Sequence, residues 1–158
     1  MHPLVTADDG SRLLSLQDED EQTLDSLVTG GAVEHALVVL QQSDAVLLVF
    51  HRLRNDWELP GGRIAAGETA RTAAARELLE ETGYGAATLS LRGVAHSTRP
   101  PDGRNDFAAV FTGTGGQVVA SSAVPNEEVA AITWWGGSPL TGRLDPIDAV
   151  IARWANSL

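Results

Sequence analysis

Alternating apolar and polar residues predict a series of short strands along most of the chain. The predicted strands are residues 32–40, 45–51, 57–59, 88–96, 106–112, 117–120 and 129–135. Each is rich in β-branched or aliphatic residues and bounded by Gly, Pro, Asn, Asp or Ser, which favour turns. The first two flank Gln41-Gln42-Ser43-Asp44, a predicted turn. No internal repeat interrupts this pattern, so one sheet is expected.

Two segments have helical character instead. Residues 69–82 are mostly alanine, leucine, arginine and glutamate, and Gly83 is placed to end a helix. Asp145-Pro146 supplies an N-cap and a proline at the first helical position. The helix after it has one apolar stripe, expected to pack in the core: Ile147, Val150, Ile151 and Trp154. The pattern therefore predicts a mixed sheet with a central and a C-terminal helix, in an α+β fold or a layered α/β/α fold of the α/β class.

The first 30 residues have a pattern of their own. Residues 4–7 and 11–17 flank Asp8-Asp9-Gly10 and predict a hairpin, and a short helix is predicted between residue 18 and Gly30-Gly31. Seven acids and one arginine give this segment −6 of the formal net charge of −10. We divide the chain into an acidic accessory segment, 1–30, and a main domain, 31–158. The segment is expected to pack on the domain or across a homodimer, and to affect oligomeric state or substrate choice.

Composition narrows the function further. The 158 residues, 43% hydrophobic, suffice for one core. Cysteine and lysine are absent, which excludes thiolate nucleophiles, Cys-ligated zinc, Schiff bases and the P-loop lysine. The acidic balance argues against a large nucleic-acid partner. No apolar stretch approaches the roughly 20 residues of a membrane span and no signal peptide is evident, so a cytoplasmic protein without a membrane partner is expected.

The helix at 69–82 carries an unusual concentration of charge. At 100° per residue, Glu77, Glu80 and Glu81 fall within an arc of about 100°. The opposite side, expected to face the core, carries Ala74, Ala75, Leu78 and Leu79. Like charges at these spacings repel, and the helix dipole disfavours anions in the last turns. Such joint violations are typical of functional sites, and Mg²⁺ or Mn²⁺ would relieve them.

The surrounding sequence resembles the Nudix box, G-x5-E-x7-R-E-U-x-E-E-x-G-U, where U is aliphatic. The chain has Gly62, five residues, Glu68, seven residues, and then Arg76-Glu77-Leu78-Leu79-Glu80-Glu81-Thr82-Gly83-Tyr84. All seven fixed identities are present, and Tyr84 replaces the last aliphatic residue. The resemblance implies a Nudix-type α/β/α sandwich with a mixed β-sheet, a central loop–helix–loop and a C-terminal helix.

The same resemblance implies a metal site. Its ligands would be Glu77, Glu80, Glu81 and the Gly61 carbonyl, with Mg²⁺ as the cofactor and Mn²⁺ as a substitute. The catalytic base would be Glu80 or Glu128. Glu128 is a candidate because it precedes Trp134 by six residues, as in many family members. Its neighbour Glu127 is the local competitor.

Other residues near the box receive supporting roles. Gly62, Glu68, Arg76 and Gly83 are expected to be structural, with Arg76 and Glu68 paired to fix the loop against the helix. The candidates for binding substrate phosphates are Arg52, Arg54 and Arg63. The histidines His35, His51 and His96 show no ligand spacing and are expected to be structural.

The resemblance leaves several functions open. A nucleoside triphosphate pyrophosphohydrolase, including one acting on damaged nucleotides, is the leading hypothesis, with a small nucleotide-containing substrate. An ADP-ribose or nucleotide-sugar pyrophosphatase is the alternative, since Pro100-Pro101 faintly resembles a proline used by that branch. A sensor domain without hydrolysis is disfavoured because every box glutamate is present. Trp57, Phe107 or Trp134 is expected to lie near the base.

Overall fold

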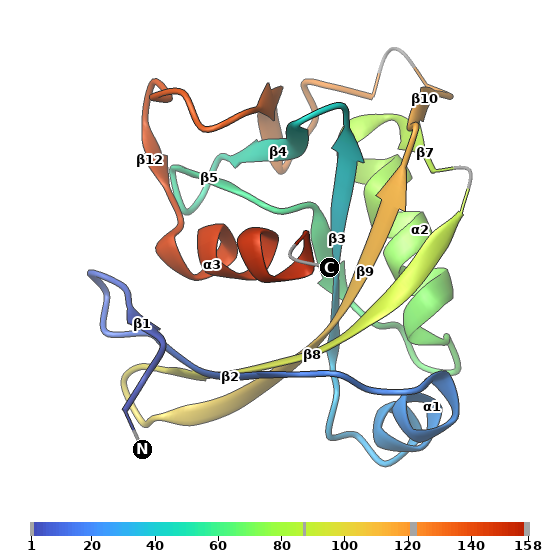
Figure 1. The fold of residues 1–158 in the computed structure, drawn as a ribbon, viewed down its shortest axis with the longest axis vertical. Coiled ribbons are helices and arrows are strands. Elements are labelled where there is room, and N and C mark those ends of the chain that lie inside the picture. Colours follow the sequence, from blue (N-terminus) through green and yellow to red (C-terminus); the bar gives the residue numbers. More distant parts are fainter. Residues whose placement is uncertain (1, 87, 121–122, 157–158) are drawn as a thin grey trace.

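The fold is built around a mixed sheet whose central strand is β3 (Figure 1). The computed structural model describes residues 2–86, 88–120 and 123–156. The strands are β1 (Val5–Thr6), β2 (Arg12–Gln17), β3 (His35–Gln42), β4 (Ala45–His51), β5 (Asp56–Glu58), β6 (Gly61–Arg63), β7 (Tyr84–Gly85), β8 (Leu89–Arg99), β9 (Arg104–Thr114), β10 (Gln117–Val118), β11 (Val129–Trp135) and β12 (Arg143–Leu144). The helices are α1 (Glu21–Thr29), α2 (Ala70–Thr82) and α3 (Pro146–Ala155).

The sheet combines parallel and antiparallel pairs. Its order is β1-β2-β8-β9-β3-β4-β5-β12, with β11 paired to β4 and β6 paired to β3. β3 runs parallel to β9, and β8 is antiparallel to β9. One end of β3 pairs with β4 and the other end with β6. β6 therefore lies beside the centre of the sheet, which places Gly61 and Gly62 there.

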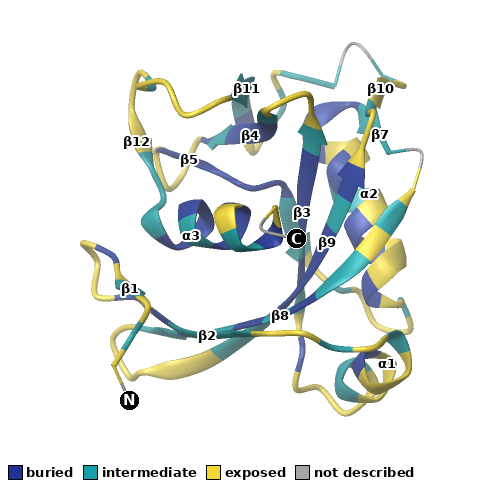
Figure 2. Ribbon diagram, in the orientation of Figure 1, coloured by how far each residue is buried: buried dark blue, intermediate teal, exposed yellow. Residues whose placement is uncertain are grey.

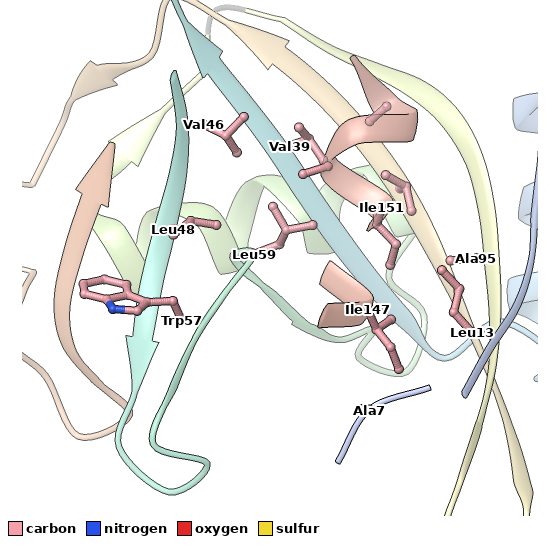
Figure 3. Close-up of a cluster of buried hydrophobic side chains, with 13 residues drawn as sticks. Ala7, Leu13, Val39, Val46, Leu48, Trp57, Leu59, Ala95, Ile147 and Ile151 are labelled. Atoms are coloured by element: carbon pink, nitrogen blue, oxygen red, sulfur yellow. The ribbon is translucent and has the colours of Figure 1, made fainter. Parts of the chain in front are cut away.

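Helices cover both faces of the sheet, as alternation along β3 requires. Val38 and Leu40 pack in the core that contains α2. Val39 packs in the other core, with Ile147 and Ile151 of α3 (Figure 3). The predicted α/β/α sandwich with a mixed sheet is confirmed. Among the described residues, no helix combines the length and apolar character needed to cross a membrane.

The N-terminal segment contains the predicted hairpin and helix, and its second strand belongs to the main sheet. β2 pairs antiparallel with β8, with Leu13 opposite Ser97. Leu13 and Leu24 are fully buried, one in each core. β1 and α3 are neighbours at the edge of the molecule (Figure 1). The division after residue 30 stays a prediction.

Most predicted elements agree with the structure to within a few residues. β4 and β11 have the predicted bounds, and α2 follows Thr69 as N-cap and ends at Gly83, whose φ of 76° is left-handed. Asp145 caps α3 as expected. The predicted strand 117–120 is shorter, since β10 ends at Val118. The very short strands β6, β7 and β12 were not predicted.

The predicted core face of α2 is partly wrong. Ala75 and Leu79 are exposed, Leu79 by 39%. Figure 2 shows exposed and buried residues alternating along α2. The buried apolar residues are Ala70, Ala73, Ala74 and Leu78. Glu81 is also buried, only 6% exposed, because the face that packs on the sheet is rotated toward the glutamates. The carboxylates therefore adjoin the core instead of lying opposite it.

Candidate active site

Five glutamates gather between α2 and the loop that precedes β11. The glutamate cluster consists of Glu77, Glu80, Glu81, Glu127 and Glu128, which line one pocket of about 280 Å³ together with Asn126. The Asn126 side-chain oxygen accepts hydrogen bonds from the backbone N–H of Glu128 (2.9 Å) and of Val129 (2.8 Å). Its amide nitrogen donates to the Glu80 carbonyl (3.4 Å). This asparagine therefore fixes the loop against the helix and brings Glu128 to the box glutamates.

Gly61 and Gly62 lie against the same cluster. The Gly61 N–H donates to Oε1 of Glu81 (2.8 Å). A Cβ at Gly62 would lie 2.5 Å from the carboxyl carbon of Glu77, and one at Gly61 would lie 2.3 Å from the Ala36 carbonyl oxygen. A side chain at Gly61 would therefore clash with the backbone of β3, and one at Gly62 would displace the Glu77 carboxylate. The role of the Gly61 carbonyl as a ligand stays a prediction.

Arg76 joins the loop before α2 to the helix. Its Nε and Nη2 donate to the two Glu68 oxygens (2.8 and 2.9 Å), as the predicted pair requires. Nη2 also donates to the Arg63 carbonyl (3.0 Å). Nη1 reaches Glu77 (2.9 Å) and Glu80 (3.2 Å). Arg76 holds the pKa of Glu68 at about 2, so this pair stays ionised at neutral pH.

The cluster carries more negative charge than its surroundings compensate. Burial, aided by the charges of Glu77 and Glu128, raises the pKa of Glu81 to about 8 despite the Gly61 hydrogen bond. Burial also raises the pKa of Glu77, while Arg76 opposes the rise. The donors are all hard carboxylate oxygens, the ligands that Mg²⁺ and Mn²⁺ prefer. The donor set and its uncompensated charge therefore fit a divalent cation.

A cavity of about 400 Å³ lies on the other side of Gly61 and Gly62, which form part of its wall. Leu13 and Ala95 of the sheet face Ile147 and Ile151 of α3 in its apolar part (Figure 3). Because Gly61 and Gly62 also contact Glu81 and Glu77, the cavity adjoins the glutamate cluster. Its size falls within the range of small-molecule sites.

A second group of carboxylates lies at the edge of this cavity. This acid cluster consists of Asp56, Glu58, Asp145 and Asp148, the last three of which line the cavity. Carboxylate oxygens of Asp56, Glu58 and Asp145 lie within 4.8 Å of one another. Burial, followed by a hydrogen bond with Glu58, raises the pKa of Asp56 to about 8. Asp56 and Glu58 therefore share a proton near neutral pH.

Cationic and backbone groups compensate the rest of the acid cluster. Arg54 donates to both Glu58 oxygens, from Nε (2.6 Å) and Nη2 (2.8 Å). The Leu59 N–H donates to Asp148 (2.9 Å), whose pKa is raised by its complete burial. Arg143 lies 3.8 Å from Asp56. Unlike the glutamate cluster, this group is neutralised within the protein.

The three arginines proposed for phosphate binding lie in different places. Arg54 lines the cavity, whereas Arg52 donates to the Asn126 carbonyl (2.8 Å) near the glutamate loop. Arg63 pairs with Glu34 (3.2 Å) and does not line the cavity. Sequence reasoning missed Arg99 and Arg104, which line the cavity and face each other across β8 and β9. Their signal was their position on either side of the Pro100–Gly103 turn.

The histidines have the structural partners expected of them. His35 contacts Asp106 (2.8 Å), and His35 also lines the cavity. The Leu53 N–H donates to Nδ1 of His51 (3.2 Å). His96 contacts Asn105 (2.9 Å).

Trp57, Phe107 and Trp134 are not among the described residues that line the cavity, and the expectation that one of them lies near a base stays a prediction. The Trp57 indole N–H donates to the Thr141 carbonyl (2.9 Å). Trp134 packs edge-on against Tyr84, with ring centroids 5.5 Å apart. Phe107 stacks on His96, with centroids 4.2 Å apart. Partners within the fold therefore occupy all three rings.

Comparisons with known proteins agree with this architecture. The model of the NUDIX domain family matches residues 31–154. A Bacillus subtilis (strain 168) protein provisionally named an 8-oxo-dGTP diphosphatase is 40% identical over 98 residues, 62% of each chain. An 8-oxo-(d)GTP phosphatase of Mycolicibacterium smegmatis is 30% identical over 83% of this chain and 41% of its own length. The chain therefore spans about two fifths to three fifths of these two relatives.

Solved structures share the fold at low sequence identity. A pyrophosphohydrolase from Bacillus subtilis, BsRppH, superposes with a TM-score of 0.69 at 19% identity, covering 98% of this chain and 93% of that one. A MutT NUDIX hydrolase from Burkholderia pseudomallei gives a TM-score of 0.63 at 20% identity, over 76% and 95% of the two chains. With the family match over most of its length and the complete box on α2, this chain belongs to the Nudix family.

Proposed function

We propose that the chain is a Mg²⁺-dependent enzyme that hydrolyses nucleoside triphosphates to a monophosphate and pyrophosphate. The observation that carries this proposal is the contact of the glutamate cluster with Gly61 and Gly62, whose other side lines the cavity. A site for phosphates and a site for a nucleoside are thus adjacent. The names of the two relatives favour a guanine nucleotide with an oxidised base.

Glu77, Glu80, Glu81 and the Gly61 carbonyl would hold the cation. Mg²⁺, when bound, supplies neutralisation of phosphate charge and a lower pKa for the attacking water. The Gly61 N–H and Arg76 orient Glu81 and Glu77 for this role, since each donates to one oxygen and leaves the other available. Glu68 in turn fixes the Arg76 guanidinium through two hydrogen bonds.

Glu128 is the better placed of the two candidate bases. Arg76 contacts one oxygen of Glu80 at 3.2 Å. The Glu128 carboxylate has no ion pair or hydrogen bond with the described residues, and its position is fixed through its backbone by Asn126. A base must be free to accept a proton, so Glu128 would take the proton of the attacking water.

The cavity would receive the nucleoside. Its apolar part, between the sheet and α3, suits the faces of a planar base. Glu58 and Asp148 at its edge offer carboxyl groups to the nucleoside, and Arg54 holds Glu58 in place. Polar and charged side chains make up much of the remaining wall, so the cavity offers hydrogen-bonding groups beside its apolar part.

Three matched variants within one pocket test the mechanism. We expect Glu128→Gln to lower hydrolysis by at least about 10²-fold. Glu127→Gln, the neighbouring control, should stay close to the parent enzyme. Glu80→Gln should have an effect between the two. A larger loss in Glu80→Gln than in Glu128→Gln would transfer the role of base to Glu80, and a dominant loss in Glu127→Gln would assign it to that residue.

The second candidate substrate is ADP-ribose, since Pro100 lines the cavity. Equal concentrations of 8-oxo-dGTP, dGTP and ADP-ribose, incubated with Mg²⁺ and separated by chromatography, distinguish the two functions. We expect the triphosphates to give monophosphate and pyrophosphate fastest. Preferential conversion of ADP-ribose to AMP and ribose phosphate would make the chain an ADP-ribose pyrophosphatase, and no conversion of any nucleotide would refute the enzyme proposal.

A further inference from the structure

Part of the cavity wall comes from outside the segment that matches the family. The family match begins at residue 31, but Asp9, Ser11 and Leu13 all line the cavity. Leu13 is fully buried in β2, opposite Ser97 of β8, which also lines the cavity. The hairpin of β1 and β2 therefore completes a site whose remaining wall belongs to the Nudix domain.

This part of the wall lies far from the glutamate cluster. Pairing across the sheet runs from β6, which carries Gly61 and Gly62, through β3, β9 and β8 to β2. Four steps at the usual strand spacing span about 19 Å. A nucleotide with its phosphates at β6 would therefore extend its base toward β2.

The turn between β1 and β2 offers two polar groups at this end. The backbone of Ser11 is satisfied, since its N–H donates to Asp9 (2.8 Å) and its carbonyl accepts from Ala7 N–H (2.8 Å). The hydroxyl is different: Ser11 is 1% exposed, and its Oγ meets hydrogen-bond geometry with no described residue, although it lies close enough to Asp9 to lower the pKa of that carboxyl. Alanine would preserve every bond that the fold uses at this position. A buried hydroxyl without a partner is unfavourable unless something in the cavity completes it.

Asp9 is held in its charged form beside that hydroxyl. The Ser11 N–H, and more weakly the Ser11 hydroxyl, Arg99 and Arg143, lower the pKa of Asp9. Arg143 also lies 3.8 Å from Asp8, which ties the turn to β12. The hydrogen bond within the turn and the Arg143–Asp8 contact therefore both hold the turn in position. The Asp9 carboxylate can accept hydrogen bonds from N–H groups of a ligand.

We propose that the β1–β2 turn, through Asp9 and Ser11, binds the N–H-bearing edge of the substrate base and sets the base preference of the enzyme. This inference rests on the proposed function, because it takes the cavity to be the nucleoside site. It assigns a purpose to a segment that the family match does not include. Asp9 and Ser11 determine specificity here and take no part in the chemical step.

The test measures binding separately from hydrolysis. Titration calorimetry of the full chain with dGMP, 8-oxo-dGMP and dUMP, without metal, gives the affinity of the cavity for each base. Asp9→Asn and Ser11→Ala keep the turn, because asparagine accepts the Ser11 N–H as aspartate does. Ser15→Ala is the matched control, because Ser15 lies on β2 close to the turn but does not line the cavity.

We expect each turn variant to bind the preferred monophosphate with an affinity lower by about fivefold to tenfold. The difference in affinity between the bases should also become smaller. With triphosphates and Mg²⁺, the loss should appear in KM and not in kcat. The affinity of both turn variants for Mn²⁺ should equal that of the parent protein. Ser15→Ala should bind the monophosphates as the parent does. Equal affinities for all four proteins, or no binding of any monophosphate by the parent, would overturn the inference. Weakened binding in a protein that hydrolyses no nucleotide would support it and refute the proposed function instead.

Discussion

The glutamate cluster and the acid cluster both bring several carboxylates together, but the protein treats their charge in opposite ways. In the acid cluster, Arg54 binds Glu58 through two hydrogen bonds, and Asp56 shares a proton with Glu58. In the glutamate cluster, Arg76 is the arginine among the described residues that forms hydrogen bonds with the carboxylates, and its donors are divided among Glu68, Glu77 and Glu80. Burial raises the pKa of Glu81 to about 8, because no cationic group of the described residues compensates its ionised form there.

This difference separates two uses of the same chemical group. Carboxylates that are neutralised by arginine and protons can form hydrogen bonds with an uncharged ligand without repelling it. Carboxylates left without compensation favour a cation, and their repulsion is the cost that binding removes. Closeness alone is misleading, since the tighter oxygen cluster is the acid cluster. We therefore base the proposed metal site on the compensation of charge and not on the density of carboxylates.

The largest effect is expected for Glu81→Gln. Hydrolysis should fall by at least about 10²-fold, because the variant removes a cation ligand that Gly61 orients. The apo protein should melt at the same or a higher temperature, since the variant also removes a buried carboxylate with a raised pKa. Activity with Mg²⁺ and thermal melting check both expectations. Parental activity in Glu81→Gln would show that this carboxylate holds no cation.

A smaller loss, about tenfold, is expected for Arg76→Lys. Lysine retains the charge but cannot bind both Glu68 oxygens and Glu77 with fixed geometry. The measurement is kcat/KM of Arg76→Lys compared with that of the control variant Arg71→Lys. Arg71 pairs with Glu21, away from the glutamate cluster. Equal values for the two variants would mean that the orientation of Arg76 is unimportant.

The stability of the apo protein should depend moderately on pH, because buried carboxyl groups titrate. Asp56 and Glu81 have folded pKa values of about 8, above their ordinary values, so the folded state binds more protons between these limits. Their contribution is complete below about pH 4 and is lost as pH rises through 8. The apo protein should therefore melt lower at pH 8.5 than at pH 6.

Asp56→Asn should reduce this decrease in Tm. The amide donates to Glu58 as the protonated acid does, at any pH. A chain of this size changes its Tm by about 2–4 °C for each kcal/mol of stability. The decrease in Tm between pH 6 and pH 8.5 should therefore be smaller in Asp56→Asn than in the parent by several degrees. Asp44→Asn, at an exposed turn, is the control. An identical pH profile for Asp56→Asn and the parent would contradict the shared proton.

The sequence predicted the glutamate helix and the sandwich because both depend on the spacing of residues that are close together in the sequence. The box glutamates, the cap at Thr69 and the stop at Gly83 depend only on neighbours along the helix. The alternation in β3 and β4 likewise follows local patterns. The inward rotation of α2, which exposes Leu79 and buries Glu81, depends on how the helix packs on the sheet.

The acid cluster and the cavity were not predicted, for a related reason. Asp56 and Asp145 are far apart in the sequence, and the parallel pairing of β12 with β5 brings their neighbourhoods together. Arg99 and Arg104 become cavity residues only because β8 and β9 lie beside β2. No local pattern records such long-range neighbours. Glu128 was found only through the family resemblance.

Cation binding to the two clusters is the most direct test of the central claim. Mn²⁺ affinity, measured by electron paramagnetic resonance at one pH, should be compared among the parent, Glu81→Gln and Asp56→Asn. We predict at least a tenfold loss in Glu81→Gln and a change of less than about twofold in Asp56→Asn. A protein that loses Mn²⁺ with Asp56→Asn and keeps it with Glu81→Gln would place the cation in the acid cluster and contradict the account.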